Sequence, residues 1–433
     1  MFRMFGFVFF LLQFIAMDAA AQTVQKGDLS AFVDSLISAM PSGIGTNDYH
    51  SPSPAQRQSF SAAAEYCLKG NLSSASASAA AFGYRCITFT DTVTAVNRQY
   101  IILLRGRDSS NHWGTFIFNP AAQRTRLVIQ SPHELFDTKT GPQGAYVFQG
   151  LSARAFFLNG AHRCNNSESS SCSGTTTACG ASGPFKISDQ AHTDIGTFQL
   201  ATAVLLQYRN DAVVVQLHGF GKSAGDPDLI MGNGTAAAPA GPDHVTALKN
   251  ALLMIDPSLT FKIAHVDTAW TDLTGTTNTQ GRLVNNSANP CSVKPAAANG
   301  RFLHIEQAYS GLRDTKTSWK KMSDALGTVF PADPLSVNEQ DEDFPKAFTL
   351  FECYPNPFNP STTVRFTLQV SGLTTLKIYD ALGREVSTLV NENLEAGLYH
   401  QRTFDASHLA TGNYFARLTS GGISQMKKIV LMK

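Results

Sequence analysis

The stretch VVVQLHG, residues 213–219, is the most apolar strand-like run in the chain, and it carries His218 near its end. A short continuous apolar run of this kind is typical of a fully buried strand. Three other apolar runs also carry a histidine at or just after their end: His133 in LVIQSPHELFD, His162 in AFFLNGAHRCNN and His304 in RFLHIEQ. Ligands and catalytic groups of open α/β sheets gather at the carboxyl edge of the strands. We therefore expect these histidines to lie close together.

Strand-like and helix-like segments alternate through residues 125–330. ARAFFLNG, VVVQLHG, LTFKIAHVD and RFLHIEQ are typical of buried strands, whereas TFQLATAVLLQY, HVTALKNALLMI and KTSWKKMSDALG resemble helices. The alternation predicts an α/β domain, a mixed open sheet with helices on both faces. Four β-like segments in a row come before these strands, and three of them lie within residues 22–124, which are predicted to form an N-terminal subdomain or an edge of the sheet.

Residues 1–21 have the pattern of a secretory signal peptide. Arg3 supplies an early positive charge, residues 5–17 are apolar, and small residues precede Gln22. The apolar run is shorter than the roughly 20 residues that a membrane-spanning helix needs. We therefore expect no membrane span and a mature chain that begins near Gln22.

The last part of the chain alternates strand-like runs with turns. Its opening segment, YPNPFNPSTTVRFTL (354–368), is interrupted by prolines, which exclude helix and favour extended backbone. Runs with a period of two follow, among them TTLKIYD, ATGNYFARLTSG and SQMKKIVLMK. Residues 351–433 are therefore predicted to form an all-β module. The acidic, proline-containing residues 331–350 are predicted to be the linker that precedes it.

This module closely resembles the type A C-terminal sorting domain of the type IX secretion system. The resemblance covers residues 351–433 and rests on an ordered set of motifs: 354–360 (YPNPFNP), 378–380 (IYD), Gly383, 397–399 (GLY), 412–415 (GNYF) and the basic pair 427–428. It implies an immunoglobulin-like sandwich and the type IX secretion machinery as a partner. It also implies passage through the periplasm to a secreted or cell-surface location, often with removal of the domain.

The chain has seven cysteines, all after the signal segment: Cys67, Cys86, Cys164, Cys172, Cys179, Cys291 and Cys353. In an exported protein cysteines predict disulfide bonds. We expect Cys67 to pair with Cys86, because the two flank one Ser/Ala-rich segment. One bridge within the loop 164–179 and one from that loop to Cys291 would use four more. A cysteine-ligated zinc in the same loop is the alternative, although its spacing matches no common zinc finger.

The histidines and nearby carboxylates predict a metal site. His133 ends a strand, and Asp137, or alternatively Glu134, follows in the same loop. With His218 from a distant strand they would form a His-carboxylate-His site that leaves a coordination position for water. We expect a single zinc ion per chain. Glu306 is the predicted general base, taking a proton from the water that the metal activates.

Further polar residues are predicted to surround this metal. Arg163 and Arg313 are candidate clamps for a substrate carboxylate or a developing oxyanion, because a guanidinium donates two parallel hydrogen bonds to such a group. We assign Arg163 and His192 to catalysis, and His162, Asn166 and Arg313 to substrate binding. For the two histidines, metal binding, ligand orientation and leaving-group stabilisation remain alternatives.

Two nearby features have a structural interpretation. Asp189 and Asp194 are interpreted as caps of the apolar helix that follows, Asp194 as its N-cap. Residues 271–286 (TDLTGTTNTQGRLVNN) are either a substrate loop or a solvated turn, and the turn is favoured.

The order of these segments resembles the N-formylglutamate amidohydrolases and their zinc-carboxypeptidase-like relatives over about residues 125–326. The matching segments are 132–133 (PH), 217–219 (LHG) and 304–306 (HIE). The resemblance implies a zinc-carboxypeptidase-like fold and cleavage of an amide bond near a carboxylate, in an acylated amino acid, a γ-glutamyl chain or a peptide. One departure is that the carboxypeptidase pattern has His-x-x-Glu, whereas Phe136 is the third residue after His133. The third ligand would then be Asp137 or Glu134.

Other classes of function are weaker. A net charge of +1 argues against a nucleic-acid partner, since phosphate binding needs clustered cationic charge. The segment LHGFGKSAGD has a superficial likeness to a lipase oxyanion loop, but no G-x-S-x-G elbow follows a strand, which argues against a serine hydrolase. A non-catalytic binding protein displayed on the cell surface is the main alternative. The leading expectation is a secreted metal-dependent amidohydrolase or carboxypeptidase-like enzyme.

Overall fold

The computed structural model describes residues 24–94, 97–107, 109–333, 348–351, 353, 355–368, 372–394 and 399–433. The predicted signal peptide, residues 1–21, lies outside the described residues, as does most of the predicted linker. Among the described residues, no helix combines the length and apolar character that a membrane crossing requires.

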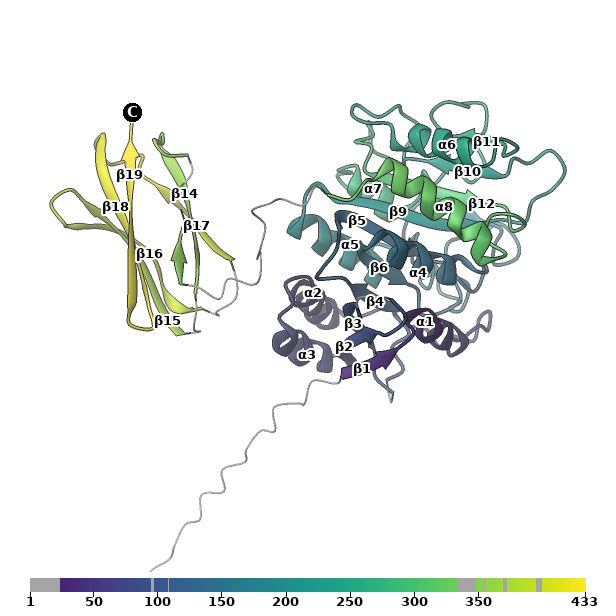
Figure 1. Ribbon diagram of the computed structural model, residues 1–433, viewed down its shortest axis with the longest axis horizontal. Coiled ribbons are helices and arrows are strands. Elements are labelled where there is room, and N and C mark those ends of the chain that lie inside the picture. The colour runs from purple at the N-terminus through teal and green to yellow at the C-terminus, as the bar shows by residue number, and fades with distance from the viewer. Residues whose placement is uncertain are drawn as a thin grey trace, which may run out of the picture.

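A single mixed sheet forms the centre of residues 24–333 (Figure 1). Its strand order is β1-β2-β3-β4-β6-β5-β9-β12-β10-β11. The strands are β1 (Val24–Gly27), β2 (Tyr84–Asp91), β3 (Gln99–Arg105), β4 (Thr115–Phe118), β5 (Arg124–Ser131), β6 (Ala153–Leu158), β9 (Val213–Gly219), β10 (Leu229–Gly232), β11 (Phe261–Ile263) and β12 (Phe302–Gln307). Strands β6, β5, β9 and β12 run parallel, while β2, β3, β4 and β6 pair antiparallel in turn. The mixed α/β class predicted from the alternating segments is confirmed.

Helices cover both faces of this sheet. The helices of one layer contribute side chains to a single hydrophobic core. They are α1 (Leu29–Ser38), α4 (Thr140–Leu151), α6 (His244–Ile255) and α8 (Lys316–Val329). The other layer consists of α2 (Pro54–Leu68), α3 (Leu72–Ala80), α5 (Thr197–Tyr208) and the short α7 (Thr279–Val284). The interpretation of residues 271–286 as a solvated turn is therefore wrong for the part that forms α7, because five of its six residues are buried.

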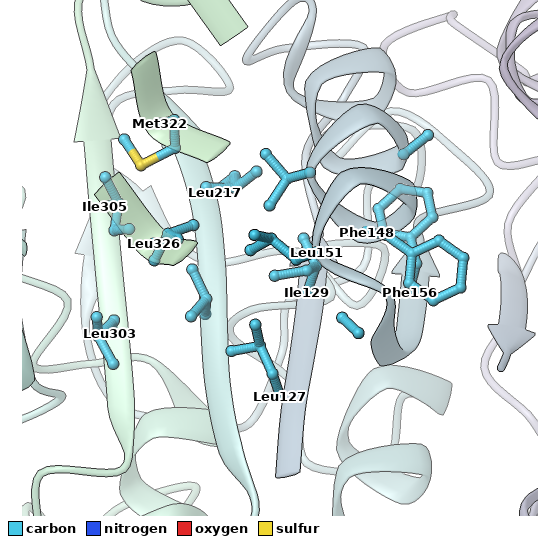
Figure 2. Close-up of a cluster of buried hydrophobic side chains, with 14 of the residues drawn as sticks. Leu127, Ile129, Phe148, Leu151, Phe156, Leu217, Leu303, Ile305, Met322 and Leu326 are labelled. Atoms are coloured by element: carbon cyan, nitrogen blue, oxygen red, sulfur yellow. The ribbon is translucent and has the colours of Figure 1, made fainter. Parts of the chain in front are cut away.

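The alternation of side chains along the central strands separates an apolar face from a polar one. Leu217 of β9 and Ile305 of β12 are register partners, and they pack with Met322 and Leu326 of α8 (Figure 2). Successive residues of a strand point to opposite faces. The neighbours that face the α5 and α7 layer are therefore Gln216, His218, His304 and Glu306. The fold thus places a row of buried polar side chains on one face of an otherwise apolar sheet.

Two disulfide bonds hold the loops beside this polar row. Cys164 is bonded to Cys179, and Cys172 is bonded to Cys291, in agreement with the predicted pattern. The predicted bridge between Cys67 and Cys86 is wrong for this structure. Their sulfur atoms lie 3.6 Å apart, and both residues are buried free thiols, Cys67 in α2 and Cys86 in β2. A disulfide needs about 2.05 Å between the sulfurs.

The C-terminal residues form two antiparallel sheets with a hydrophobic core of their own. One sheet has the order β13-β14-β17 and the other β16-β15-β18-β19. The strands are β13 (Thr349–Leu350), β14 (Ser361–Thr367), β15 (Gly372–Asp380), β16 (Glu385–Leu394), β17 (Tyr399–Asp405), β18 (Gly412–Ser420) and β19 (Ile423–Leu431). This all-β region is consistent with the predicted sandwich.

Candidate metal centre

Two histidines and one carboxylate converge where β5 and β9 end. The strands are parallel neighbours, so His133, just after β5, lies beside His218 at the end of β9. The backbone N–H of Asp137 donates to the His133 carbonyl. This hydrogen bond closes a turn that brings the Asp137 carboxylate close to the His133 ring. Asp137 Oδ2 lies 3.4 Å from His133 Nδ1 and 3.1 Å from His218 Nδ1. All three side chains are buried, and their ligand atoms lie within 4.8 Å of one another.

The turn also explains which carboxylate reaches the centre. Phe136, three residues after His133, points outward and is 42% exposed. The Glu134 carboxylate accepts hydrogen bonds from the backbone N–H groups of Lys139 and Gly141, so it is occupied at the start of α4. Of the two carboxylates considered for the third ligand, the structure brings Asp137 to the histidines.

The Nε2 atoms of His133 and His218 are hydrogen-bonded on the side away from Asp137, so their Nδ1 atoms face the Asp137 carboxylate. His133 Nε2 lies 2.8 Å from Asp189 Oδ1, and His218 Nε2 lies 2.8 Å from Gln216 Oε1. A carboxylate can only accept, so His133 Nε2 carries the proton and His133 Nδ1 keeps a lone pair when the ring is neutral. His133 Nδ1 is buried and has no hydrogen-bond partner among the described residues. Three buried acceptors that face one another, one of them Asp137 Oδ2, fit a cation between them.

The charges of these groups agree with a cation at this point. Burial, reinforced by His304, lowers the pKa of His218 far below its usual range, so this ring is neutral at physiological pH. Burial and Arg163 lower the pKa of His133, yet Asp189 and Asp137 outweigh them and the net shift is upward. A proton therefore competes with a cation mainly at His133.

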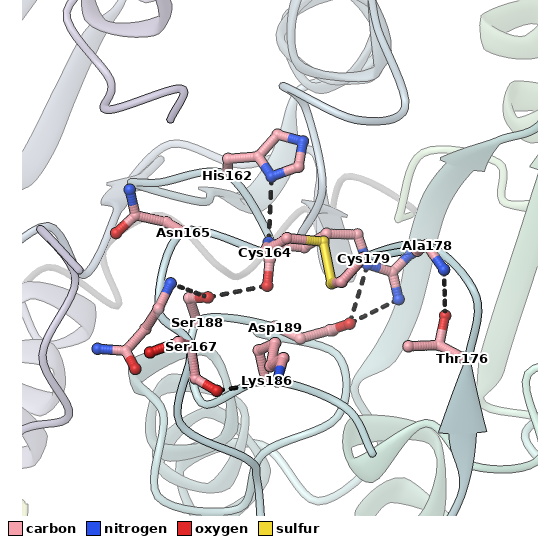
Figure 3. The surroundings of a disulfide bond; sticks show 12 residues. His162, Cys164, Asn165, Ser167, Thr176, Ala178, Cys179, Lys186, Ser188 and Asp189 are labelled. Atoms are coloured by element: carbon pink, nitrogen blue, oxygen red, sulfur yellow. Dashed lines mark hydrogen bonds and ion pairs between the residues drawn. A yellow bond between two sulfur atoms is a disulfide. The ribbon is translucent and has the colours of Figure 1, made fainter. Parts of the chain in front are cut away.

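Asp189 contacts the side of the His133 ring away from Asp137, and it lies near the Cys164–Cys179 disulfide (Figure 3). Its Oδ2 accepts hydrogen bonds from Nε and Nη2 of Arg163, at 2.9 and 2.5 Å, and its Oδ1 lies 2.9 Å from His192 Nδ1. His133, Asp189 and His192 also lie close enough to share an ion. We favour the first trio, because Asp189 already accepts from the Arg163 cation.

Asp189 was assigned to helix capping on sequence grounds, and that interpretation is wrong. Helix α5 begins after Gly196 and has no side-chain cap, so neither Asp189 nor Asp194 caps it. The sequence did not predict the contacts of Asp189, because its partners His133, Arg163 and His192 come from three separate segments of the chain.

Glu306 stands next to the trio on β12. It is the register partner of His218, so both side chains leave the same face of the sheet. Its Oε1 lies 3.3 Å from His304 Nε2, whereas its Oε2 is buried and without a hydrogen-bond partner among the described residues. An unpartnered buried carboxylate oxygen is costly. Such a group suits proton transfer or ligand binding.

The residues predicted to contact substrate divide into two groups. Arg163 keeps Nη1 without a hydrogen-bond partner among the described residues, and its guanidinium lies under the Phe136 ring at 5.3 Å. His162 lies 5.8 Å from the same ring, and its Nδ1 accepts from the Cys164 backbone N–H. His192 stacks on Phe185 at 3.7 Å, and burial lowers its pKa to about 4, so it is neutral at physiological pH.

Asn166 and Arg313 are held in structural hydrogen bonds. Asn166 donates to the Tyr49 carbonyl and accepts from the Glu168 backbone N–H. Nε, Nη1 and Nη2 of Arg313 donate to the carbonyls of residues 307, 138 and 220, respectively. Both side chains stabilise loops around the centre, and their assignment to substrate binding stays a prediction.

Comparison with known proteins identifies the C-terminal region. Residues 352–432 match the family model of the secretion system C-terminal sorting domain. This confirms the sorting domain predicted from the short motifs, and it supports interaction with the type IX secretion machinery and a secreted or cell-surface location. No curated protein matches the chain. The similarity of residues 125–326 to the N-formylglutamate amidohydrolases therefore stays a hypothesis.

Proposed function

We propose that the protein is a secreted metal-dependent hydrolase, with its site within residues 125–330, that cleaves an amide bond near a substrate carboxylate. The observation that carries the proposal is the convergence of three buried acceptors, on His133, Asp137 and His218, beside the unpartnered carboxylate oxygen of Glu306. The resemblance to zinc-carboxypeptidase-like hydrolases points to the same reaction class.

Zinc is the metal that best suits this set of donors. Two imidazole nitrogens and one carboxylate oxygen are a common ligand set of catalytic zinc, which keeps its fourth position for water or substrate. Bound zinc would supply a nucleophile at neutral pH by lowering the pKa of water to about 7. We expect one zinc per chain.

The surrounding side chains have roles that follow from their positions. Glu306 Oε2 is free to take the proton of the attacking water and to return it to the leaving amine. Asp189 holds the His133 ring through Nε2, as carboxylates commonly do behind metal-binding histidines. Arg163 offers Nη1 to a single anionic oxygen, either the developing oxyanion or a substrate carboxylate, because Asp189 occupies its Nε and Nη2.

The substrate class is an acylated amino acid, a γ-glutamyl chain or a peptide. Phe136, exposed above Arg163 and close to His162, would contact the substrate. A surface-displayed binding protein remains the second candidate. An open surface hollow of about 600 Å³, lined by Phe82, Arg85 and other residues outside the metal centre, would offer such a protein a place to bind a ligand.

The deciding experiment is elemental analysis of the purified mature protein after extensive dialysis, together with two variants. We expect about one zinc per chain in the wild type and loss of zinc in His218→Ala. Glu306→Gln should retain zinc while turnover of N-acyl amino acids and peptides falls by at least about 100-fold. Activity retained in Glu306→Gln would remove this residue from the base role. Absence of metal, with no activity on adding zinc, cobalt or manganese, would instead favour the binding protein.

A further inference from the structure

A chain of buried amide side chains lies directly below the metal centre. Gln216 is two residues before His218 on the same face of β9, and Gln130 of β5 is its register partner. Gln280 of α7 and Asn278, the N-cap residue of α7, approach Gln216 from the helical layer. All four amides are fully buried. Which end of Gln216 faces His218 therefore depends on its three amide partners.

Gln130 fixes the orientation from the first side. The Thr202 hydroxyl donates to the Phe198 carbonyl at 2.7 Å, so its oxygen can only accept from Gln130. Gln130 Nε2 donates to that oxygen at 2.9 Å, which leaves Gln130 Oε1 facing Gln216 at 2.8 Å. The atom of Gln216 that meets Gln130 must be the Nε2 donor.

Gln280 gives the same result independently. Its Nε2 donates to the backbone carbonyl of Gln190 at 2.9 Å, and a carbonyl can only accept. Gln280 Oε1 therefore faces Gln216, again requiring the donor Nε2 of Gln216, at 3.0 Å.

Asn278 fixes the opposite end. Its Oδ1 accepts from the Gly281 backbone N–H at 2.9 Å, so its Nδ2 is the atom directed at Gln216. A donor at this position requires the Oε1 of Gln216. The same oxygen lies 2.8 Å from His218 Nε2, so three separate anchors agree that an acceptor faces this ring.

We propose that Gln216 is a positioning residue that holds His218 as the tautomer with its proton on Nε2, which leaves the Nδ1 lone pair free for the metal. The proposal rests on the proposed function for its role in metal binding, whereas the tautomer itself is a property of the metal-free protein. It explains why glutamine occurs in the most apolar strand of the chain, where an unpartnered amide would be costly.

Without this constraint the ring has a competing arrangement. His218 Nδ1 lies 3.1 Å from Asp137 Oδ2, and a proton on Nδ1 would form a charge-assisted hydrogen bond to that carboxylate. The proton would occupy the lone pairs that the metal needs. The amide chain therefore disfavours a stable but metal-blocking state of His218.

The tautomer can be read directly by long-range 15N–1H correlation spectra of the chelator-treated protein with labelled histidine. A protonated ring nitrogen and an unprotonated one have well-separated 15N shifts, and the His218→Ala spectrum assigns the signals. We expect a protonated Nε2 and an unprotonated Nδ1 in the wild type. Gln216→Met, which keeps the size of the side chain but removes the acceptor, should shift His218 toward the Nδ1–H form. It should also weaken zinc binding by about 10- to 100-fold in competition with a chromogenic chelator.

Gln143→Met is the matched control. Gln143 is equally buried and donates to another buried glutamine, Gln307, at 2.8 Å, so it undergoes the same chemical change outside the amide chain. It should leave the tautomer and the zinc affinity unchanged.

The outcomes separate this inference from the proposed function. A wild-type His218 with its proton on Nδ1 would overturn the inference, even if Gln216→Met failed to fold. Unchanged tautomer and zinc affinity in a folded Gln216→Met would do the same while leaving the hydrolase proposal intact. A wild-type Nε2–H tautomer that shifts in Gln216→Met, in a protein that binds no zinc, would support the inference and contradict the hydrolase proposal.

Discussion

Asp189 pairs with three basic side chains beside the candidate metal centre: Arg163, His133 and His192. Burial by itself raises its pKa, but Arg163, His192 and His133 outweigh burial and hold the pKa well below its usual range. The group therefore stays ionised in the folded protein at pH values where it is protonated in the unfolded chain, whose aspartate pKa is about 3.9. Its stabilising contribution is present above about that pH and is lost as the pH falls through the folded pKa.

Asp189→Asn should make the protein less stable at neutral pH and less sensitive to acid. The variant leaves the Arg163 cation buried without its partner, and breaking a buried pair in this way typically costs about 3–5 kcal/mol. Thermal unfolding at pH 7 and pH 3 would measure the effect. The gap between wild type and variant should be smaller at pH 3, which lies below the aspartate pKa of the unfolded chain, than at pH 7. A gap of equal width at both values would show that the charge of Asp189 does not stabilise the fold.

Some residues of the candidate centre were predictable from the sequence, whereas others depend on local backbone geometry that the sequence does not show. His133 and His218 follow apolar strands, so their meeting was predictable from the way that parallel strand ends converge. Asp137 was predictable only as one of two candidates, because the turn that buries it and exposes Phe136 depends on a backbone hydrogen bond. Gln216 was overlooked, although an amide within an apolar strand, two residues before a histidine, was a visible signal.

At the scale of elements, the strands and long helices that carry the centre were predictable from their apolar runs. Helix α7 was not, because a buried six-residue helix has too few turns to show a periodic pattern. Side chains of β9 and β12 pack with α8 in one hydrophobic core, on the face of the sheet opposite the candidate metal centre. The positions of the polar side chains therefore depend on the apolar packing of β9 and β12 against α8.

Leu326→Ala in α8 should test this support. Leu326 is fully buried against the sheet, and a buried leucine replaced by alanine usually costs about 2–5 kcal/mol. We expect a lower midpoint in urea unfolding. Met254→Ala is the control in a helix of the same layer, since Met254 is 85% exposed and should change stability by less than about 0.5 kcal/mol. Equal, small effects in both variants would mean that α8 contributes little to holding the strands.

On the scale of the whole molecule, the hydrophobic clusters define the boundary between the two folded regions more clearly than amino-acid composition does. One core cluster includes Leu29 near the start of the described chain and Phe330 near the end of α8, so residues 24–333 share a sheet and a core. The strands of residues 84–118 form one side of that sheet rather than a separate sheet. The C-terminal strands contribute to a different cluster, made only of residues 348–431. The candidate metal centre and the sorting domain thus belong to parts of the chain with separate cores.

Removing residues 348–433 should therefore abolish export and leave the candidate metal centre intact. In a bacterium with type IX secretion machinery, we expect the truncated chain to accumulate inside the cell while the full-length chain reaches the surface or the medium, as measured by fractionation and immunoblotting. Because the cores are separate, the truncated protein should keep its zinc content and its thermal midpoint. The converse fusion, a reporter with a signal peptide and residues 348–433, should be exported. Equal export of the truncated chain would mean that another segment directs delivery, and loss of zinc or of folding would mean that the metal centre depends on the sorting domain.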